Sequence, residues 1–190
     1  RRTTFSRVKK NAKRFWLVSQ LSIFQYNKHM KKLLIFLLIP LFSFSQVKLT
    51  DESVVEHINS FFNALNIKNY DKKLLKQKVT NDFVIFEMGD KFTLDEFTNF
   101  IELAGFLEWD STEWILSDFK ISIDSSSAHV SYLNTGTFVY PNPYKEGVTL
   151  KEDKKWLESV YIVLDGEDLK IKFLQSDDIY SKISVLRKSL

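Results

Sequence analysis

The chain has 190 residues and no cysteine, and its formal net charge is +3. Residues 1–45 contain ten basic side chains and no acidic one, so residues 46–190 carry 17 basic against 24 acidic residues, a net charge of −7. An acidic domain repels phosphate backbones, which excludes nucleic acid as an expected partner. The lack of cysteine excludes a disulfide framework, a cysteine nucleophile and lipid attachment at cysteine.

Residues 30–45 have the form of a secretory signal peptide. A short positive region, Met-Lys-Lys at 30–32, precedes an apolar run at 33–44. Ser-Phe-Ser at 43–45 supplies the small-x-small pattern that a signal peptidase cleaves, which places the cut before Gln46. We therefore expect an exported protein, periplasmic or extracellular.

The apolar run is shorter than the roughly 20 residues that a membrane-spanning helix needs, and Pro40 interrupts it. This predicts that no stable membrane anchor remains after cleavage. Retention of the signal as an anchor is the alternative. Residues 1–29 are expected to lie upstream of the signal and outside the domain.

Two helices are predicted at the start of the domain. Thr50 is placed to cap the first helix, whose first turn holds two acidic residues that the helix dipole favours. Apolar residues at spacings of four, three, one and three predict one buried stripe on a helix that runs to about residue 66. The stripe consists of Val54, Ile58, Phe61, Phe62 and Leu65. A second, short helix is expected over residues 69–79, with its lysines on a solvated face.

A strand and a third helix follow. Residues 82–88 alternate in the way that is typical of a strand. Thr93 and Glu96 have the spacing of a capping box, which predicts a helix start, and Gly105 is placed to end that helix. Large apolar residues at 106–109 then fall in a predicted loop, where they need a partner surface such as the core or the rim of a pocket.

From residue 112 the period of the sequence changes to two, which predicts a sheet of consecutive strands at 113–124, 128–140, 156–164 and 169–176. The last two strands are expected to form a hairpin, joined by Asp-Gly-Glu-Asp at 165–168. Gly136 suggests a bulge within its strand. Residues 145–155 are expected to form a polar connection with a short extended piece near 148–150.

Residues 177–190 are predicted to form an amphipathic C-terminal helix. Four apolar residues recur there at spacings of four, three and four, namely Ile179, Ile183, Leu186 and Leu190. We expect this helix to pack on the domain or on a partner copy. Contact with a membrane surface is the alternative.

Three local features carry a resemblance to a known family: Phe-Phe-Asn-Ala-Leu-Asn at 61–66, Asp-Phe-Val-Ile-Phe at 82–86, and Leu-Lys-Ile-Lys-Phe-Leu-Gln-Ser at 169–176. Together with helices that precede long strands, they resemble the nuclear transport factor 2-like superfamily, particularly its SnoaL-like group, over residues 50–176. Many members have a tryptophan and a histidine where Leu169 and Gln175 stand here, so the match is partial.

The resemblance implies an α+β fold, the cystatin-like roll, in which a cone-shaped, curved antiparallel sheet packs on N-terminal helices. It implies one domain over residues 46–176, a pocket at the open end of the cone, and dimerisation through the outer face of the sheet. The residues give separate support for a homodimer, because the strand at 156–164 is apolar on both faces and one layer of helices covers only one face.

Glu158 is the candidate catalytic residue. A carboxyl group inside an apolar cone has a raised pKa and can transfer protons near neutral pH. The alternative for Glu158 is a solvated position near a strand end. Six residues are candidates for the lining of the pocket: Trp109, Tyr132, Asn134, Phe138, Phe173 and Gln175.

No metal and no cofactor are expected. His57 and His129 fall on different predicted elements without the spacing of metal ligands, and His129 is expected on the outer face of the sheet. The sequence has no Gly-rich phosphate loop and no nucleophile elbow.

Two functions stay open. One is an exported binding or interaction module that holds a small apolar ligand, or no ligand, in its cone. The other is an isomerase, cyclase or dehydratase that acts on a small apolar substrate through Glu158 or another buried acid. A carboxyl group that faces the cavity with a polar partner would support the hypothesis of an enzyme, whereas a wholly apolar pocket would exclude that hypothesis.

Overall fold

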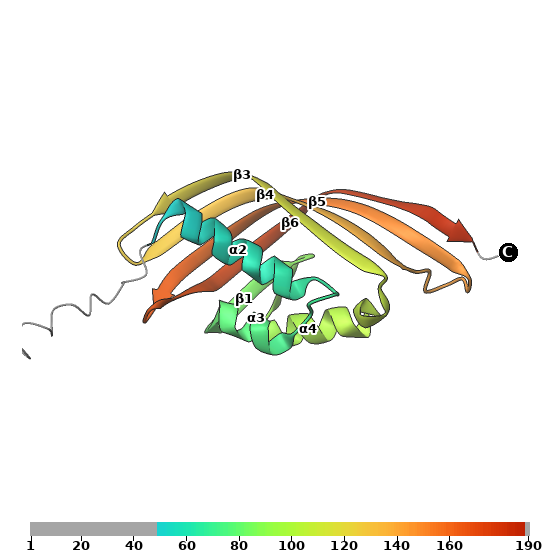
Figure 1. Ribbon diagram of the computed structural model, residues 1–190, viewed down its shortest axis with the longest axis horizontal. Helices are drawn as coiled ribbons and strands as arrows, with labels where there is room; N and C mark the ends of the chain where they lie inside the picture. The colour runs from blue at the N-terminus through green and yellow to red at the C-terminus, as the bar shows by residue number, and fades with distance from the viewer. Residues whose placement is uncertain (1–48, 189–190) are drawn as a thin grey trace, which may run out of the picture. The chain divides into compact units, whose positions relative to one another are not determined.

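The computed structural model describes residues 49–188, so the predicted signal peptide at 30–45 and the upstream segment at 1–29 lie outside the described residues. The described part forms a single sheet with its helices on one face (Figure 1). None of the helices in this part of the chain is long and apolar enough to cross a membrane.

The helices are α2 (Asp51–Leu65), α3 (Lys72–Lys78), α4 (Leu94–Leu103) and the short 3-10 helix η2 (Phe106–Glu108). Thr50 caps α2 through reciprocal hydrogen bonds with Ser53, and Thr93 caps α4 in the same way with Glu96. Gly105 follows α4 with a φ of 86°, a left-handed conformation that glycine adopts without strain. The three helices predicted before residue 106 are confirmed, although α3 is shorter than expected.

Six strands form the sheet in the order β2-β1-β6-β5-β4-β3. They are β1 (Val79–Glu87), β2 (Asp90–Phe92), β3 (Ser111–Ile123), β4 (Ser127–Pro141), β5 (Val148–Asp165) and β6 (Asp168–Lys188). The predicted α+β fold, a curved sheet packed on helices, is confirmed. One detail differs, because β1 pairs in parallel with β6 and the sheet is therefore mixed.

Two predictions about β5 and β6 are wrong. Residues 148–155 form the first part of β5 rather than a polar connection, and residues 177–188 continue β6 rather than forming a helix. The two segments pair with each other, from Val148 opposite Lys188 to Lys155 opposite Tyr180. The hydrogen bonds of this pairing outweigh a helical spacing that rested on only four apolar residues. We call these paired segments the sheet extension and the remainder of the sheet the sheet body.

Irregular register decides which side chains of the sheet body face the helices. Ile162 lies opposite Ile171, but Tyr161 lies opposite Phe173, so β6 has one extra residue at this point. The two-residue alternation therefore changes phase, and Leu174 becomes buried in the core. The bulge predicted at Gly136 is wrong, because β4 pairs with β5 there without a shift.

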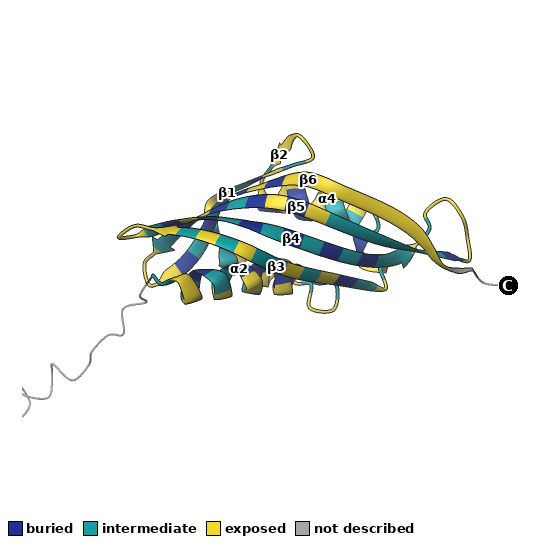
Figure 2. Cartoon of the chain, turned by 90° about the horizontal axis from the view of Figure 1, so that it is seen from above, coloured by how far each residue is buried: buried dark blue, intermediate teal, exposed yellow. Residues whose placement is uncertain are grey.

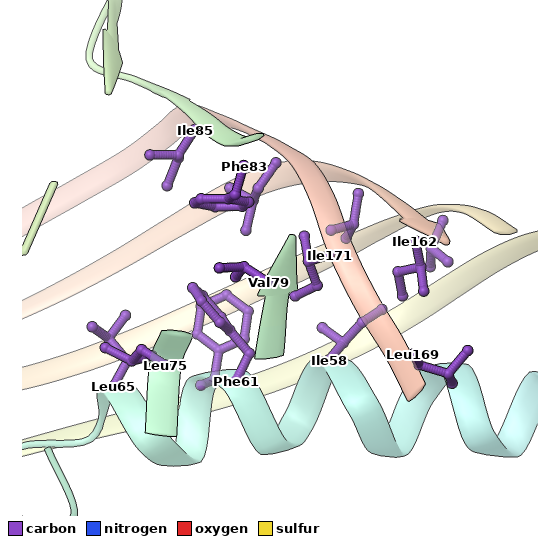
Figure 3. Close-up of a cluster of buried hydrophobic side chains, with 14 of the residues drawn as sticks. Ile58, Phe61, Leu65, Leu75, Val79, Phe83, Ile85, Ile162, Leu169 and Ile171 are labelled. Atoms are coloured by element: carbon purple, nitrogen blue, oxygen red, sulfur yellow. The ribbon is translucent and has the colours of Figure 1, made fainter. Parts of the chain in front are cut away.

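The core lies between the helices and the sheet body (Figure 3). The predicted stripe of α2 is buried in full: Val54, Ile58, Phe61, Phe62 and Leu65. Ile162 of β5 and Ile171 of β6 are completely buried in the same cluster. Because burying one such side chain contributes roughly 1.5–3 kcal/mol, this stripe is what holds α2 against the sheet.

Candidate functional site

A cavity of about 200 Å³ lies beside this core, between the helices and the sheet. Nine of the residues that line it are aromatic: Phe61, Phe62, Phe97, Phe100, Phe106, Trp109, Trp114, Phe138 and Trp156. Five have polar or charged side chains: Glu87, Glu152, Lys154, Glu158 and Ser176. The polar groups come from β1, β5 and β6, so the cavity is apolar along its helices and polar along one part of the sheet.

Three neighbouring strands supply the aromatic wall. The ring of Trp114 on β3 lies 4.9 Å from that of Phe138 on β4 and 5.8 Å from that of Trp156 on β5, measured between centroids. Gly136 leaves room for these rings, because a Cβ atom at this position would meet Phe138 Cζ at 2.6 Å and Trp156 Cζ3 at 2.7 Å. The glycine therefore shapes the wall of the cavity rather than bending the strand.

Glu158 lies on the sheet side of the cavity and is only 6% exposed. Asn134 Nδ2 donates a hydrogen bond to Glu158 Oε1 at 3.1 Å, and Ser176 Oγ donates to the same oxygen at 3.3 Å. Burial raises the pKa of Glu158 from 4.5 to about 7, against the opposing effect of its hydrogen bonds. The carboxyl group can therefore gain or lose a proton near neutral pH.

Tyr132 lies opposite Glu158 in the register of β4 and β5. Its hydroxyl group is buried close to the carboxylate but falls short of a well-formed hydrogen bond. Burial, and then the charge of Glu158, raise the pKa of Tyr132 well above its ordinary value. Tyr132 therefore stays neutral and keeps its proton beside the carboxylate.

A second carboxyl group, Glu87 at the end of β1, lines the same cavity. Burial raises the pKa of Glu87, and the negative charges of Asp178 and Asp177 add to the rise. The charge on Glu87 in turn raises the pKa of Glu158. Two carboxyl groups with raised pKa values thus share one cavity, and a charge on either one favours a proton on the other.

Lys154 is the positive group of the cavity lining. Its Nζ lies 5.0 Å from the centroid of the Trp156 ring and 2.8 Å from a carboxylate oxygen of Asp178. The lysine side chain is only 17% exposed, so its ion pair is screened less by water than a surface pair. It supplies a fixed positive charge near Glu87, where it opposes the rise in pKa.

Glu152 lines the cavity from within the sheet extension. Its carboxylate accepts hydrogen bonds from the Tyr140 hydroxyl at 2.9 Å and from Ser181 Oγ at 3.1 Å. The ring of Trp109 stacks on Tyr140 with the centroids 5.1 Å apart. These contacts fix the end of the cavity that lies toward the sheet extension.

Five of the seven predicted site residues lie in or beside the cavity, and two do not. Glu158, Trp109 and Phe138 lie in the lining of the cavity. Tyr132 and Asn134 are buried outside the lining, where they contact Glu158.

Phe173 and Gln175 do not line the cavity, and the prediction that they do is corrected. The phase change in β6 turns both side chains away from the core. Phe173 packs edge-to-face on Phe86 with centroids 5.4 Å apart, and Gln175 is exposed. Ser176, the next residue, takes the position beside Glu158 instead.

Neither described histidine takes part in the site. His57 Nε2 lies 2.9 Å from the carbonyl oxygen of Lys78, and His129 is exposed and lies 2.8 Å from Ser159 Oγ. Within residues 49–188, no three or more His, Cys, Asp or Glu side chains gather in a way that could hold a metal ion.

The sequence did not identify Glu87, Ser176, Trp114 or Trp156 as parts of the site. The inward alternation of β5 placed Trp156 on the same face as Glu158, which was a usable signal. Glu87 and Ser176 gave no such signal, because they meet only through the parallel pairing of β1 with β6.

The described residues have the nuclear transport factor 2-like fold, as the solved structures to which they are similar establish. An NTF2-like superfamily protein from Salmonella enterica serovar Typhimurium gives a TM-score of 0.55 at 12% sequence identity, covering 67% of this chain and 89% of that protein. The Kfla4162 protein of Kribbella flavida gives a TM-score of 0.59 at 12% identity, with 69% and 91% covered.

A third solved structure with this fold is a candidate scytalone dehydratase from Novosphingobium aromaticivorans. Its TM-score is 0.55 at 15% identity, and the alignment covers 73% of this chain and 89% of that protein. No family model matches the chain, and no curated protein matches it. At these identities the likeness establishes the fold, so function has to be argued from the cavity.

Proposed function

We propose that the cavity binds a small, mostly apolar molecule and that Glu158 exchanges a proton with it, as in an isomerase or a dehydratase. One observation carries the proposal: a carboxyl group with a pKa of about 7 lies in the lining of an otherwise aromatic cavity. A general acid or base works best when its pKa is close to the ambient pH. A wholly apolar pocket would have left only a binding role.

The contacts of Glu158 fit this role. Asn134 and Ser176 both donate to Oε1 and so fix the orientation of the carboxyl group. Oε2 makes no well-formed hydrogen bond among the described residues, and the neutral Tyr132 hydroxyl lies close to the carboxylate. Proton removal from a carbon next to a carbonyl group, with return of the proton elsewhere, is the reaction that this arrangement suits best.

Two proteins of similar structure are named after the proposed reactions, dehydration and isomerisation. One is the candidate dehydratase from Novosphingobium aromaticivorans. The other is a candidate ketosteroid isomerase from Shewanella frigidimarina, with a TM-score of 0.50 at 16% identity and 67% of this chain covered. Their names agree with proton transfer in this cavity, and the identities are too low for residue roles to be transferred.

Exchange of carbon-bound hydrogen tests the proposal without knowledge of the natural substrate. We expect the full chain to accelerate the exchange of α-hydrogens of 2-tetralone for deuterium in D₂O, followed by proton NMR. Glu158→Gln keeps the shape of the side chain and removes the titrating group, and we expect a loss of about 10²-fold or more in the exchange rate. Glu113→Gln, an exposed position on β3, is the matched control.

Binding is measured in the same samples. Trp109, Trp114 and Trp156 line the cavity, so their fluorescence reports occupation by 2-tetralone. Binding that persists in Glu158→Gln while exchange disappears supports proton transfer. Equal exchange rates in the two proteins would refute the role of Glu158.

A second candidate function is binding without chemistry. The observation that favours it is that Asn134, Ser176 and Glu158 form a buried hydrogen-bonded group, which can serve structure alone. In that case 2-tetralone or a related apolar molecule binds, and exchange in the wild-type chain does not exceed that in buffer.

Export and self-association complete the proposal. We propose that residues 30–45 direct export and are removed before Gln46. Mass spectrometry of the exported protein should then find Gln46 at the N-terminus. A chain that still begins at Met30 in a membrane fraction would contradict the cleavage.

We also propose a homodimer through the outer face of the sheet body. Ile115 and Leu157 are more than half exposed there, and Tyr161 is 38% exposed. The association domain of Caenorhabditis elegans CaMKII gives a TM-score of 0.50 at 12% identity, and its name describes association. Leu157→Lys is expected to reduce the sedimenting mass.

A further inference from the structure

The outer edge of β6 is unpaired along the sheet extension. β1 pairs with β6 only as far as Phe86 opposite Gln175 and ends at Glu87, whereas β6 continues to Lys188. Residues 177–188 therefore have one strand neighbour, β5, among the described residues. In Figure 2 residues 177–186 of β6 lie at the margin of the sheet and are coloured as exposed. Its edge presents backbone N–H and C=O groups to an incoming strand.

The usual protections of an edge strand are weak here. Proteins shield such edges with short strands, proline, charged side chains or a covering helix, and of these the segment at 177–188 has charged side chains at five positions. The segment at 177–188 has no proline, and the helices in Figure 1 lie beneath the sheet body. It also exposes five apolar or aromatic side chains: Ile179, Tyr180, Ile183, Val185 and Leu186. An apolar, unpaired edge of this length is suited to pairing with another strand.

The charges of the segment identify the partner. The segment begins with Asp177-Asp178, has Lys182 in the middle, and ends with Arg187-Lys188. Antiparallel pairing of two identical copies places the acidic end of each, where Asp178 is also paired with Lys154, beside the basic end of the other. Parallel pairing would instead place like charges side by side along the whole segment. The sequence is thus self-complementary in the antiparallel direction.

We propose that residues 177–188 pair with the same residues of a second copy, antiparallel and across a two-fold axis, so that the two sheets become one continuous sheet. Both copies contribute the same strand, as a symmetric contact requires. The exposed apolar side chains of the two segments then lie along the shared edge. This contact is separate from the outer-face contact of the sheet body, because Ile115, Leu157 and Tyr161 are not part of it.

Sedimentation of the full chain gives the first test. Ile183→Lys combined with Val185→Lys adds charge to the edge at side chains that are 56% and 53% exposed. We expect this variant to sediment at half the mass of the wild-type assembly, with an unchanged far-UV circular dichroism spectrum. Tyr144→Lys, a 96% exposed position between β4 and β5, is the control and should keep the wild-type mass. A wild-type chain that is monomeric at micromolar concentration overturns the proposal.

Distance measurements give the second test and do not depend on a disruptive variant. The chain has no cysteine, so single variants Tyr180→Cys, Lys182→Cys, Ser184→Cys and Leu186→Cys each carry one nitroxide label. Antiparallel strands rise about 3.4 Å per residue, so the distance between the two labels changes by about 14 Å for each two-residue step away from the axis. A distance that passes through a minimum within the segment supports the proposal.

The remaining outcomes are decisive against it. A constant distance along the series indicates parallel pairing and overturns the antiparallel contact. Label distances with no minimum within the segment, together with a sedimenting mass that falls only in Leu157→Lys, are a second such outcome. That result places the dimer contact on the outer face of the sheet body and overturns the edge contact. Tight binding of an unrelated extended peptide that leaves the chain monomeric also overturns it, since the occupant would then be another protein.

Discussion

Strands β5 and β6 pass through two regions of the molecule that differ in the burial of their side chains. In the sheet body, Val160, Ile162 and Ile171 are completely buried against the helices. In the sheet extension the same two strands leave Ile183 and Val185 more than half exposed. Both regions belong to the same two strands, so burial depends on the cover that the rest of the chain provides.

The cavity lies where these regions meet. Its apolar side belongs to the sheet body and the helices, while Glu152 and Lys154 line it from the sheet extension, where Glu152 also accepts a hydrogen bond from Ser181. Glu158 is buried there and Glu87 is half-buried, and burial raises the pKa of both carboxyl groups, although Lys154 opposes the rise at Glu87. A site with titrating groups forms at the margin of the core, where packing is incomplete.

Truncation of one side chain in each region tests the comparison with the largest expected effect. Phe61→Ala removes a ring that is 1% exposed and should lower the free energy of unfolding by about 3–5 kcal/mol. Ile183→Ala in the sheet extension should cost less than about 1 kcal/mol, measured on the dissociated chain by urea denaturation. Equal losses at both positions would show that the sheet extension has a cover of its own.

The pH dependence of stability is the next prediction. The pKa of Glu158 is higher in the folded chain, about 7, than its ordinary value of 4.5, so the folded state binds the extra proton between these pH values. Stability should therefore fall as pH rises from about 4.5 to 7 and level off above 7. At about 1.4 kcal/mol per pKa unit, the loss from this group is roughly 3 kcal/mol.

Glu158→Gln should remove that part of the pH dependence. The raised pKa of Glu87 gives a contribution of the same sign, which remains in both proteins. Urea denaturation at pH 5 and pH 8 measures the difference, with Glu113→Gln as the control. Curves of wild type and Glu158→Gln that run parallel across this range would contradict the assignment.

Gly136→Ala is expected to lower the free energy of unfolding by less than Phe61→Ala does. The added Cβ would lie 2.6 Å from Phe138 Cζ and 2.7 Å from Trp156 Cζ3, so the rings must move. We expect a loss of about 1–3 kcal/mol and an altered fluorescence spectrum from Trp156. Thr135→Ala, the preceding residue, is the control. Unchanged fluorescence in Gly136→Ala would mean that the rings do not depend on the glycine.

The sequence predicted the elements whose signals are local. The α2 stripe, the Thr93–Glu96 capping box and the hairpin of β5 and β6 rest on spacings of a few residues, and all three are present. Helix caps and two-residue alternation are decided by neighbours in the chain, so they could be read without tertiary information.

The failures share a different cause. Residues 177–188 became a strand because residues 148–155 lie beside them, a long-range pairing that their own spacing does not record. Phe173 and Gln175 were assigned to the cavity by counting alternate positions, and one extra residue in β6 reversed the count. Glu87 joined the site through a parallel pairing of segments far apart in the sequence.

The central claim is that Glu158 titrates near neutral pH inside the cavity, and carbon-13 NMR of labelled glutamate carboxyl groups tests it most directly. The signal that disappears in Glu158→Gln identifies the residue. The structure predicts a titration midpoint of about 7 for that signal. A midpoint near 4.5, the ordinary value for glutamate, would contradict the claim and remove Glu158 from the proposed chemistry.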